Sequence, residues 1–390
     1  MQDSRGRTIS YLRLSVTERC NLRCRYCMPP EGVALRPRGE MLTEEEMLRA
    51  VRAAASLGVY KVRVTGGEPL VKKNILSICR GIRKIEGIRE LCLTTNGILL
   101  PEMAADLRGA GVDRINLSLD TLDAGRYSEI TRGGDLRDAL RGLQAALHAG
   151  FERVKINAVL LRETDREEIR RLADLTMRMP VDVRFIEMMP MPGNEEEQGG
   201  GCIPAGEVLS ALPEAVPLGQ EEQKPWDRGT IARLYRLPGA RGSIGLISPM
   251  SAHFCAGCNR LRLTADGHIR PCLHDSREYS IKGCTEEEMR EQFIRSIRNK
   301  PPGNPMLFGE GEAGGEPGKG AGNSAAKERE AGAGNTGTGQ EAGAGNSSAK
   351  VRETVAGNAA AEGQGTGAEG PVRKKLPRAT AGRSMSRIGG

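Results

Sequence analysis

A strand-and-helix pattern repeats six times, at a spacing of about 30 residues, in the first half of the 390-residue chain. Period-two apolar alternation predicts strands at 9–16, 60–65, 91–95, 114–119, 153–160 and 182–187. Amphipathic stretches predict helices at 43–57, 73–85, 101–110, 136–149 and 166–178. Thr43 with Glu46 reads as a capping box, and Gly58, Gly111 and Gly150 follow predicted helix ends. The repeat therefore predicts parallel strands joined by helical crossovers.

The periodicity alone leaves two α/β architectures open, a doubly wound open sheet and an incomplete barrel. The segments after the strands favour the barrel, because each is polar or glycine-rich. They are Thr17–Cys27, Gly66–Pro69, Thr95–Gly97, Ser118–Thr121 and Glu187–Pro190. A barrel gathers such loops on one rim, at the carboxyl ends of its strands. We therefore expect an incomplete (βα)6 TIM-like barrel.

The pattern changes after about residue 200, and we expect four regions. Residues 1–200 form the barrel, and residues 201–302 form an α+β region with helices at 204–214 and 285–298 and a weakly antiparallel element at 229–248. Residues 303–380 are a low-complexity segment rich in Gly, Ala, Glu and Asn, which cannot bury enough apolar surface to fold. Residues 381–390 form a short tail that ends in two glycines.

Composition excludes several classes of protein. The net charge of +7 comes from 57 basic and 50 acidic residues that are mixed along the chain, which suits a small anionic substrate better than a nucleic acid. Residues 1–15 lack the apolar core of a signal peptide, and no apolar run reaches the roughly 20 residues of a membrane span. These features predict a cytoplasmic protein, in which ten cysteines favour metal binding over disulfides.

Six of the cysteines form two triplets. Cys20, Cys24 and Cys27 have the spacing C-x3-C-x2-C, and Cys255, Cys258 and Cys272 have the spacing C-x2-C-x13-C. Structural zinc needs four ligands, and only His253 and His274 near the second triplet leave zinc open there. Three thiolates on a [4Fe–4S] cluster leave one iron without a protein ligand, and such an iron can bind a substrate or cofactor. Two open clusters indicate an enzyme.

The first triplet resembles the signature of the radical S-adenosylmethionine (SAM) superfamily, because Tyr26 directly precedes Cys27. The resemblance implies that the open iron chelates SAM and that cleavage of SAM yields a 5′-deoxyadenosyl radical. It further implies SAM contacts from Tyr26, from Gly67 in Gly66-Gly67-Glu68-Pro69, from Ser118 and from Met189.

The second triplet resembles the GTP 3′,8-cyclase family within that superfamily. The matching stretch runs from Cys255-Ala256-Gly257-Cys258-Asn259-Arg260-Leu261-Arg262 to Cys272-Leu273, and the opening 11–17 and the terminal Gly389-Gly390 match as well. The resemblance implies two [4Fe–4S] clusters, GTP as substrate and a catalytic role for Gly389 and Gly390. The implied substrate contacts are Arg13, Lys61, Arg63, Thr94, Lys155, Arg184, Arg260, Leu261 and Arg262.

The same resemblance implies a reaction and partners. The radical takes the 3′ hydrogen of GTP, C3′ bonds to C8 of guanine, and the product enters molybdenum cofactor biosynthesis. A homodimer, an electron donor and a downstream cyclic pyranopterin monophosphate synthase are implied. The sequence departs from the family pattern at His274 and Glu18 and in the segment 303–372. A peptide-modifying radical SAM enzyme with an auxiliary cluster, and a non-enzymatic zinc or iron–sulfur protein, remain the alternatives.

Overall fold

The computed structural model describes residues 1–191, 203–223, 231–304 and 385. These residues belong to one compact unit of the chain. The predicted low-complexity segment lies outside the described residues, apart from residues 303 and 304. Of the predicted tail, only Met385 is described, so the terminal di-glycine lies outside as well.

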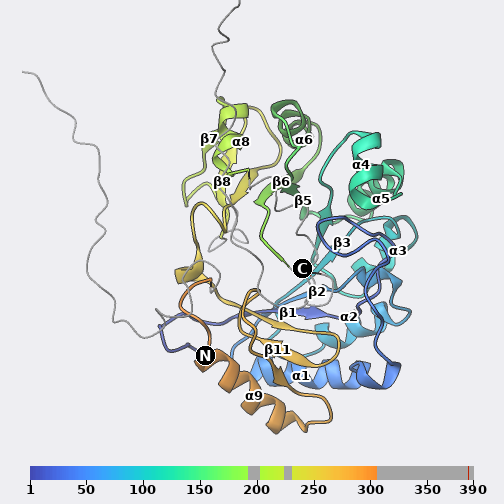
Figure 1. Ribbon diagram of the computed structural model, residues 1–390, viewed down its shortest axis with the longest axis vertical. Coiled ribbons are helices and arrows are strands. Elements are labelled where there is room, and N and C mark those ends of the chain that lie inside the picture. Colours follow the sequence, from blue (N-terminus) through green and yellow to red (C-terminus); the bar gives the residue numbers. More distant parts are fainter. Residues whose placement is uncertain (192–202, 224–230, 305–384, 386–390) are drawn as a thin grey trace, which may run out of the picture. The chain divides into compact units, whose positions relative to one another are not determined.

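Six parallel strands form the centre of a curved sheet (Figure 1). They are β1 (Tyr11–Ser15), β2 (Lys61–Thr65), β3 (Glu90–Thr95), β4 (Arg114–Ser118), β5 (Val154–Leu160) and β6 (Val181–Glu187). Each strand pairs with the next one in sequence order, and the order does not reverse. A doubly wound sheet reverses its order at a switch point, so this arrangement is the barrel type. All six strand predictions are confirmed.

The crossover helices also lie where the sequence predicts them. They are α1 (Glu44–Ser56), α2 (Ile75–Arg83), α3 (Leu100–Gly109), α5 (Leu136–His148) and α6 (Arg166–Arg178). Thr43 and Glu46 form the expected capping box. Gly58, Gly111 and Gly150 have φ values of +95°, +88° and +78°, which a glycine adopts without strain. Short 3-10 turns occur at η1 (Arg38–Glu40), η2 (Pro69–Val71) and η4 (Cys255–Gly257).

One helix in this region has no counterpart in the sequence prediction. Helix α4 (Ala124–Thr131) follows β4, and the side chain of Asp123 caps it by accepting a hydrogen bond from the Arg126 amide. Arg132 ends the helix in the left-handed conformation, with φ 55°. The helix has only eight residues, so its apolar period is too short to stand out from a loop.

The C-terminal region adds strands to both edges of the same sheet. Its elements are α8 (Gly206–Ala211), β7 (Val216–Pro217), β8 (Arg233–Arg236), β9 (Ile244–Ile247), β10 (Arg260–Leu263), β11 (His268–Arg270), β12 (Tyr279–Ser280) and α9 (Glu286–Arg298). The order in the described part is β12-β11-β10-β1-β2-β3-β4-β5-β6-β9-β8-β7. Both β10 and β9 join in parallel, and β8 pairs antiparallel with β9 as predicted. The two edge strands do not pair with each other, so the barrel is incomplete.

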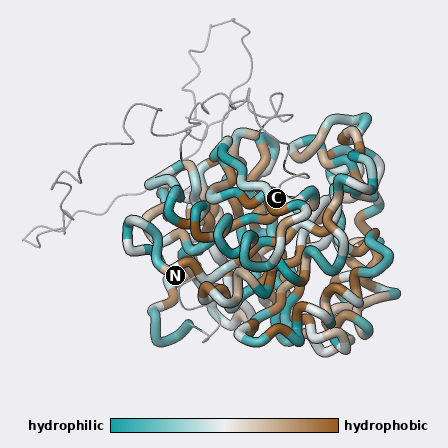
Figure 2. The backbone as a smooth tube through the Cα atoms, turned by 90° about the horizontal axis from the view of Figure 1, so that it is seen from below, coloured by the Kyte–Doolittle hydropathy of each residue, from teal (hydrophilic) through white to brown (hydrophobic). Residues whose placement is uncertain are grey.

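Alternation along the strands separates a core from an inner surface. In β1, Leu12 and Leu14 are fully buried in the apolar layer that packs between the sheet and the helices. The alternate residues Tyr11 and Arg13 face the inside of the curved sheet. Figure 2 shows how apolar and polar residues alternate along the backbone. Among the described helices, none has the length and apolar character that a membrane crossing requires.

Candidate active site

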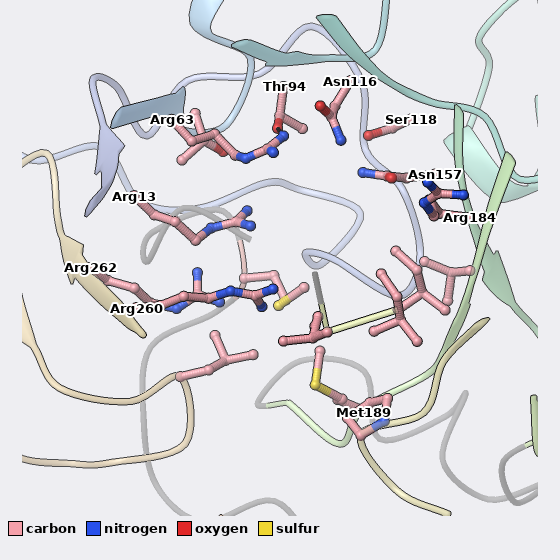
Figure 3. Close-up of a pocket in the computed structure, with 18 of the residues that line it drawn as sticks. Arg13, Arg63, Thr94, Asn116, Ser118, Asn157, Arg184, Met189, Arg260 and Arg262 are labelled. Carbon is pink, nitrogen blue, oxygen red and sulfur yellow. Dashed lines mark hydrogen bonds between the residues drawn. The ribbon is translucent and has the colours of Figure 1, made fainter. Parts of the chain in front are cut away.

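A cavity of about 550 Å³ lies inside the curved sheet, and both cysteine triplets line it. Most of the residues singled out in the sequence share this cavity (Figure 3). They are Arg13, Cys20, Cys24, Tyr26, Cys27, Lys61, Arg63, Gly67, Thr94, Ser118, Lys155, Arg184, Met189, Cys255, Cys258, Arg260, Arg262 and Cys272. The fold therefore brings together two motifs that lie at opposite ends of the described sequence.

The two triplets lie at opposite ends of one pair of strands. Cys20 follows the carboxyl end of β1. The carbonyl of Asn259 accepts hydrogen bonds from the amides of Ser10 and Tyr11, so the second triplet lies near the amino end of β1. Four residue steps of about 3.3 Å place these strand ends about 13 Å apart. A small substrate between them can reach both.

The glycine loop after β2 packs against the loop that carries the first triplet. The amides of Gly67 and Glu68 donate to the carbonyls of Thr17 and Arg19, both at 2.8 Å. A Cβ atom on Gly67 would lie 2.3 Å from the carbonyl oxygen of Arg19, so only glycine fits here. A Cβ atom on Gly66 would likewise lie 2.6 Å from the carbonyl oxygen of Thr17. Both glycines are therefore required because the backbones of the two loops approach each other closely.

Two buried carboxyl groups flank the first triplet, and sequence reasoning missed both as site residues. Asp120 accepts hydrogen bonds from the Tyr26 hydroxyl and the Val159 amide, each at 2.8 Å. Burial raises the pKa of Asp120 to about 6 despite these bonds. Burial likewise raises the pKa of Glu68 to about 7, although it accepts bonds from the Thr95 hydroxyl and from two amides. The signal available in the sequence was an acid two or three residues past a strand end, since β2 ends at Thr65 and β4 ends at Ser118.

Three arginines form a row across neighbouring strands near the second triplet. Arg13 on β1 is the register partner of Arg262 on β10 and of Arg63 on β2. Adjacent strands lie about 4.8 Å apart, so three guanidinium groups converge on one wall (Figure 3). Burial lowers the pKa of Arg13 to about 10 and the pKa of Arg262 well below its usual value. Such a row is costly without an anion to face it.

Tyr11 lies among these cations. Its hydroxyl accepts a short hydrogen bond from Nε of Arg63, and its ring centroid lies 5.2 Å from Nζ of Lys61 and 5.6 Å from the Arg260 guanidinium carbon. Although burial raises the pKa of Tyr11, the charges of Arg63, Arg13 and Arg260 outweigh it and lower the pKa to about 8. The aromatic ring of Tyr11 thus lies between these cations and makes cation–π contacts with them.

The remaining predicted cations have carboxylate partners in the structure. Lys61 and Arg114 share Glu90, at 2.9 and 3.0 Å. Lys155 and Arg184 share Asp182, at 3.6 and 3.5 Å. In the described part of the chain, Arg63 and Arg260 have no carboxylate at ion-pairing distance. The positive charge available to a ligand is therefore greatest beside the second triplet.

The second triplet and its neighbours have distinct electrostatic surroundings. Burial and the neighbouring thiols raise the pKa of Cys255. Burial alone would raise the pKa of Cys258, but the charges of Lys300 and Arg260 lower it. Burial, with the Arg262 charge beside it, lowers the pKa of His274 to about 4, so this departure from the family pattern places a neutral imidazole in the cavity wall.

Three predicted residues stand apart from the rest. The side chain of Leu261 is fully buried in the apolar core and does not line the cavity. Gly389 and Gly390 lie outside the described residues, but Met385 lines the cavity and packs with Met191 and Leu273.

Glu18, the other departure from the family pattern, is buried and lies 3.5 Å from Arg36, which also pairs with Asp266 beyond β10.

Two family models match successive parts of the chain. The model of the radical SAM superfamily matches residues 14–176, and the model named Molybdenum Cofactor Synthesis C matches residues 181–306. The GTP 3′,8-cyclase of Pelotomaculum thermopropionicum is 49% identical over 315 residues, which are 79% of this chain and 96% of the relative. The GTP 3′,8-cyclase of Desulforamulus reducens is 44% identical over 314 residues, with the same shares.

A solved structure supports the fold alone. The chain resembles Streptococcus suis SuiB bound to the precursor peptide SuiA, with a TM-score of 0.53 and 16% identity over 77% of this chain and 69% of SuiB. That identity is too low to favour a peptide substrate over the much closer cyclase relatives. With both domain models in succession and relatives of 44–49% identity, the chain is a radical SAM enzyme of molybdenum cofactor biosynthesis and belongs to the GTP 3′,8-cyclase family.

Proposed function

We propose that this chain converts GTP to (8S)-3′,8-cyclo-7,8-dihydroguanosine 5′-triphosphate, with SAM bound at the first triplet and GTP at the second. One observation carries the proposal. Both triplets line one cavity from opposite ends, and the arginine row lies at the second triplet's end. The cyclase relatives support GTP as the substrate.

At the first end, Cys20, Cys24 and Cys27 would hold a [4Fe–4S] cluster. Together with SAM, that cluster supplies a 5′-deoxyadenosyl radical when bound. Gly67 has no side chain, so its backbone can approach bound SAM closely. Tyr26, Ser118 and Met189 line the same cavity and are the other proposed SAM contacts. Asp120 fixes the Tyr26 ring through the 2.8 Å hydrogen bond.

At the second end, Cys255, Cys258 and Cys272 would hold another [4Fe–4S] cluster. Structural zinc takes four ligands, whereas three thiolates on a [4Fe–4S] cluster leave one iron without a protein ligand. That open iron would bind guanine.

The arginine row would bind the triphosphate. Guanidinium groups match phosphate oxygens in pairs, and the row of Arg13, Arg63 and Arg262 lines the cavity together with Arg260. Thr94 helps to orient Arg63 on this wall, because its hydroxyl accepts a 3.1 Å hydrogen bond from the Arg63 guanidinium. Lys61, Lys155 and Arg184 would contribute from the pairs they form with Glu90 and Asp182.

With GTP held in this way, its ribose would lie between the two ends of the cavity. Removal of the 3′ hydrogen and attack of C3′ on C8 both occur on the substrate, and one further electron and one proton complete the dihydro product. The tail would close the cavity, with Gly389 and Gly390 inside, since Met385 already packs against Met191 and Leu273. A homodimer, an electron donor and a downstream synthase belong to the same proposal.

The division of labour between the triplets can be tested with two cysteine variants. Cys272→Ser should keep SAM binding but lose GTP turnover, whereas Cys24→Ser should lose SAM binding itself. Equilibrium binding of SAM to both anaerobically reconstituted variants checks this. An equal loss of SAM binding in the two variants would reject the assignment.

A further inference from the structure

Two buried cations from opposite ends of the described chain lie behind the second cysteine triplet. Arg7 belongs to the segment before β1, and Lys300 follows α9. Their exposed fractions are only 8% and 5%. Burying a charge is costly unless it is paired or hydrogen-bonded, so each cation needs a structural reason.

Arg7 joins the N-terminal segment to the loop of the second triplet. Its Nε lies 2.6 Å from a carboxylate oxygen of Asp3, and that pairing fixes the plane of the guanidinium group. The two terminal nitrogens then donate to the carbonyls of Cys255, at 3.0 Å, and of Pro301, at 2.8 Å. One side chain thus ties a cysteine of the triplet to the segment after α9.

Lys300 holds the other two parts of the triplet. Its ammonium donates to the carbonyl of Arg260, at 2.8 Å, and to the carbonyl of Pro271. Arg260 follows Cys258 by two residues, and Pro271 directly precedes Cys272. No carboxylate among the described residues lies within ion-pairing distance of Lys300, although it lines the cavity. Its charge therefore faces the thiols and whatever they bind.

Together the two cations bind a backbone carbonyl at or near each cysteine of the triplet. Arg7 binds that of Cys255, and Lys300 binds those near Cys258 and Cys272. We propose that Arg7 and Lys300 are positioning residues that keep the three thiolates of the second triplet arranged for a [4Fe–4S] cluster and offset its negative charge. The inference rests on the proposed function, because it requires a cluster at this triplet. Groups that orient metal ligands commonly change metal affinity by about 10–100-fold.

Each variant has a matched control. Arg7→Gln and Lys300→Gln remove the charges. Arg52→Gln removes an exposed arginine whose Nε lies 2.9 Å from Glu286, and Lys282→Gln removes a lysine that donates to the Met41 carbonyl and to Glu46, both at 2.8 Å. Both controls remove one positive charge away from the triplet, and Lys282 makes two hydrogen bonds, as Lys300 does. Arg52 is more exposed than Arg7, so its variant controls for the lost charge alone. Arg7→Lys keeps the charge with fewer donors.

The experiment measures cluster retention in the anaerobically purified full chain. Wild type and both controls should hold about eight irons, and Arg7→Gln and Lys300→Gln about four, with SAM binding retained. A ferrous chelator should withdraw iron from the second cluster of Arg7→Lys roughly 10-fold faster than from wild type. The electron paramagnetic resonance signal of the second cluster should weaken in parallel.

Two results separate the inference from the proposed function. About eight irons and an unchanged second-cluster signal in both glutamine variants would overturn the positioning role alone. About four irons in wild type would overturn the two-cluster function and the inference with it. Equal iron loss in the Lys282→Gln control would also overturn the role, because loss of stability alone would then account for the effect.

Discussion

Arg13 and Arg262 are register partners on adjacent parallel strands, although Arg13 lies on the first of the six central strands and Arg262 follows all six in the sequence. Their guanidinium groups, with that of Arg63, line the cavity beside the second triplet. Burial and the neighbouring arginines lower the pKa of both Arg13 and Arg262, as expected for cations gathered on a buried wall.

The first prediction concerns this wall. Arg260→Ala or Arg262→Ala removes a charge-assisted contact worth about 1.5–3 kcal/mol, so GTP affinity should fall roughly 10- to 150-fold. SAM affinity should stay near that of wild type. Arg137→Ala is the control, since Arg137 pairs with Asp135 on the surface. GTP binding within twofold of wild type in both variants would contradict the assignment.

The second prediction concerns the glycine turn. Gly67→Ala would push a methyl group to 2.3 Å from the Arg19 carbonyl, so the cysteine loop must shift. Overpacking of this kind costs about 1–3 kcal/mol. Gly39→Ala is the control, because a Cβ there meets nothing within 4 Å. Equilibrium SAM binding should weaken only in Gly67→Ala, and equal affinity in the two variants would show that the close approach is unimportant.

The third prediction concerns pH. The folded-state pKa of Glu68 is about 7, raised from a usual value of 4.5. The folded chain therefore keeps a proton that the unfolded chain releases, and Glu68 costs stability as pH rises from about 4.5 to about 7. Glu68→Gln should remove this component, so the stability difference between variant and wild type should move in the variant's favour across that window. Denaturant unfolding at several pH values checks it, and a flat difference would contradict it.

The fourth prediction concerns the tail. Met385 lines the cavity and packs with Met191 and Leu273, four residues before Gly389 in the sequence. Removing Gly389 and Gly390 should leave SAM cleavage detectable and greatly reduce the cyclised product. Deleting residues 310–370 while keeping the tail should leave the product largely intact. Product at the wild-type rate after the di-glycine truncation would exclude a catalytic role for the tail.

The sequence predicts the barrel well because its signals are local. Strand alternation, the Thr43 capping box and the glycines after helices each depend on a few neighbouring residues. Helix α4 has too few apolar positions to stand out. The pairing of β10 with β1 is also invisible, since nothing local to Arg260–Leu263 specifies a partner that distant.

The site residues divide in the same way. The cysteines and the glycine turn carry their chemistry in their spacing, so the sequence identifies them. The partners of Lys155 and Tyr26 could not be identified, because Asp182 and Asp120 approach them from other strands and loops. Nothing in the local sequence marks Arg7 and Lys300 as neighbours of the second triplet, and only the fold shows that they reach it.

The central claim is that one cavity brings SAM at the first triplet to the ribose of GTP held at the second. Anaerobic turnover with reductant, SAM and GTP deuterated at C3′ tests it most directly. The account predicts 5′-deoxyadenosine that carries the deuterium, in step with the cyclised dihydro nucleotide, and neither product from Cys24→Ser. Unlabelled 5′-deoxyadenosine, or none of the cyclised nucleotide from protein with both clusters intact, would contradict it.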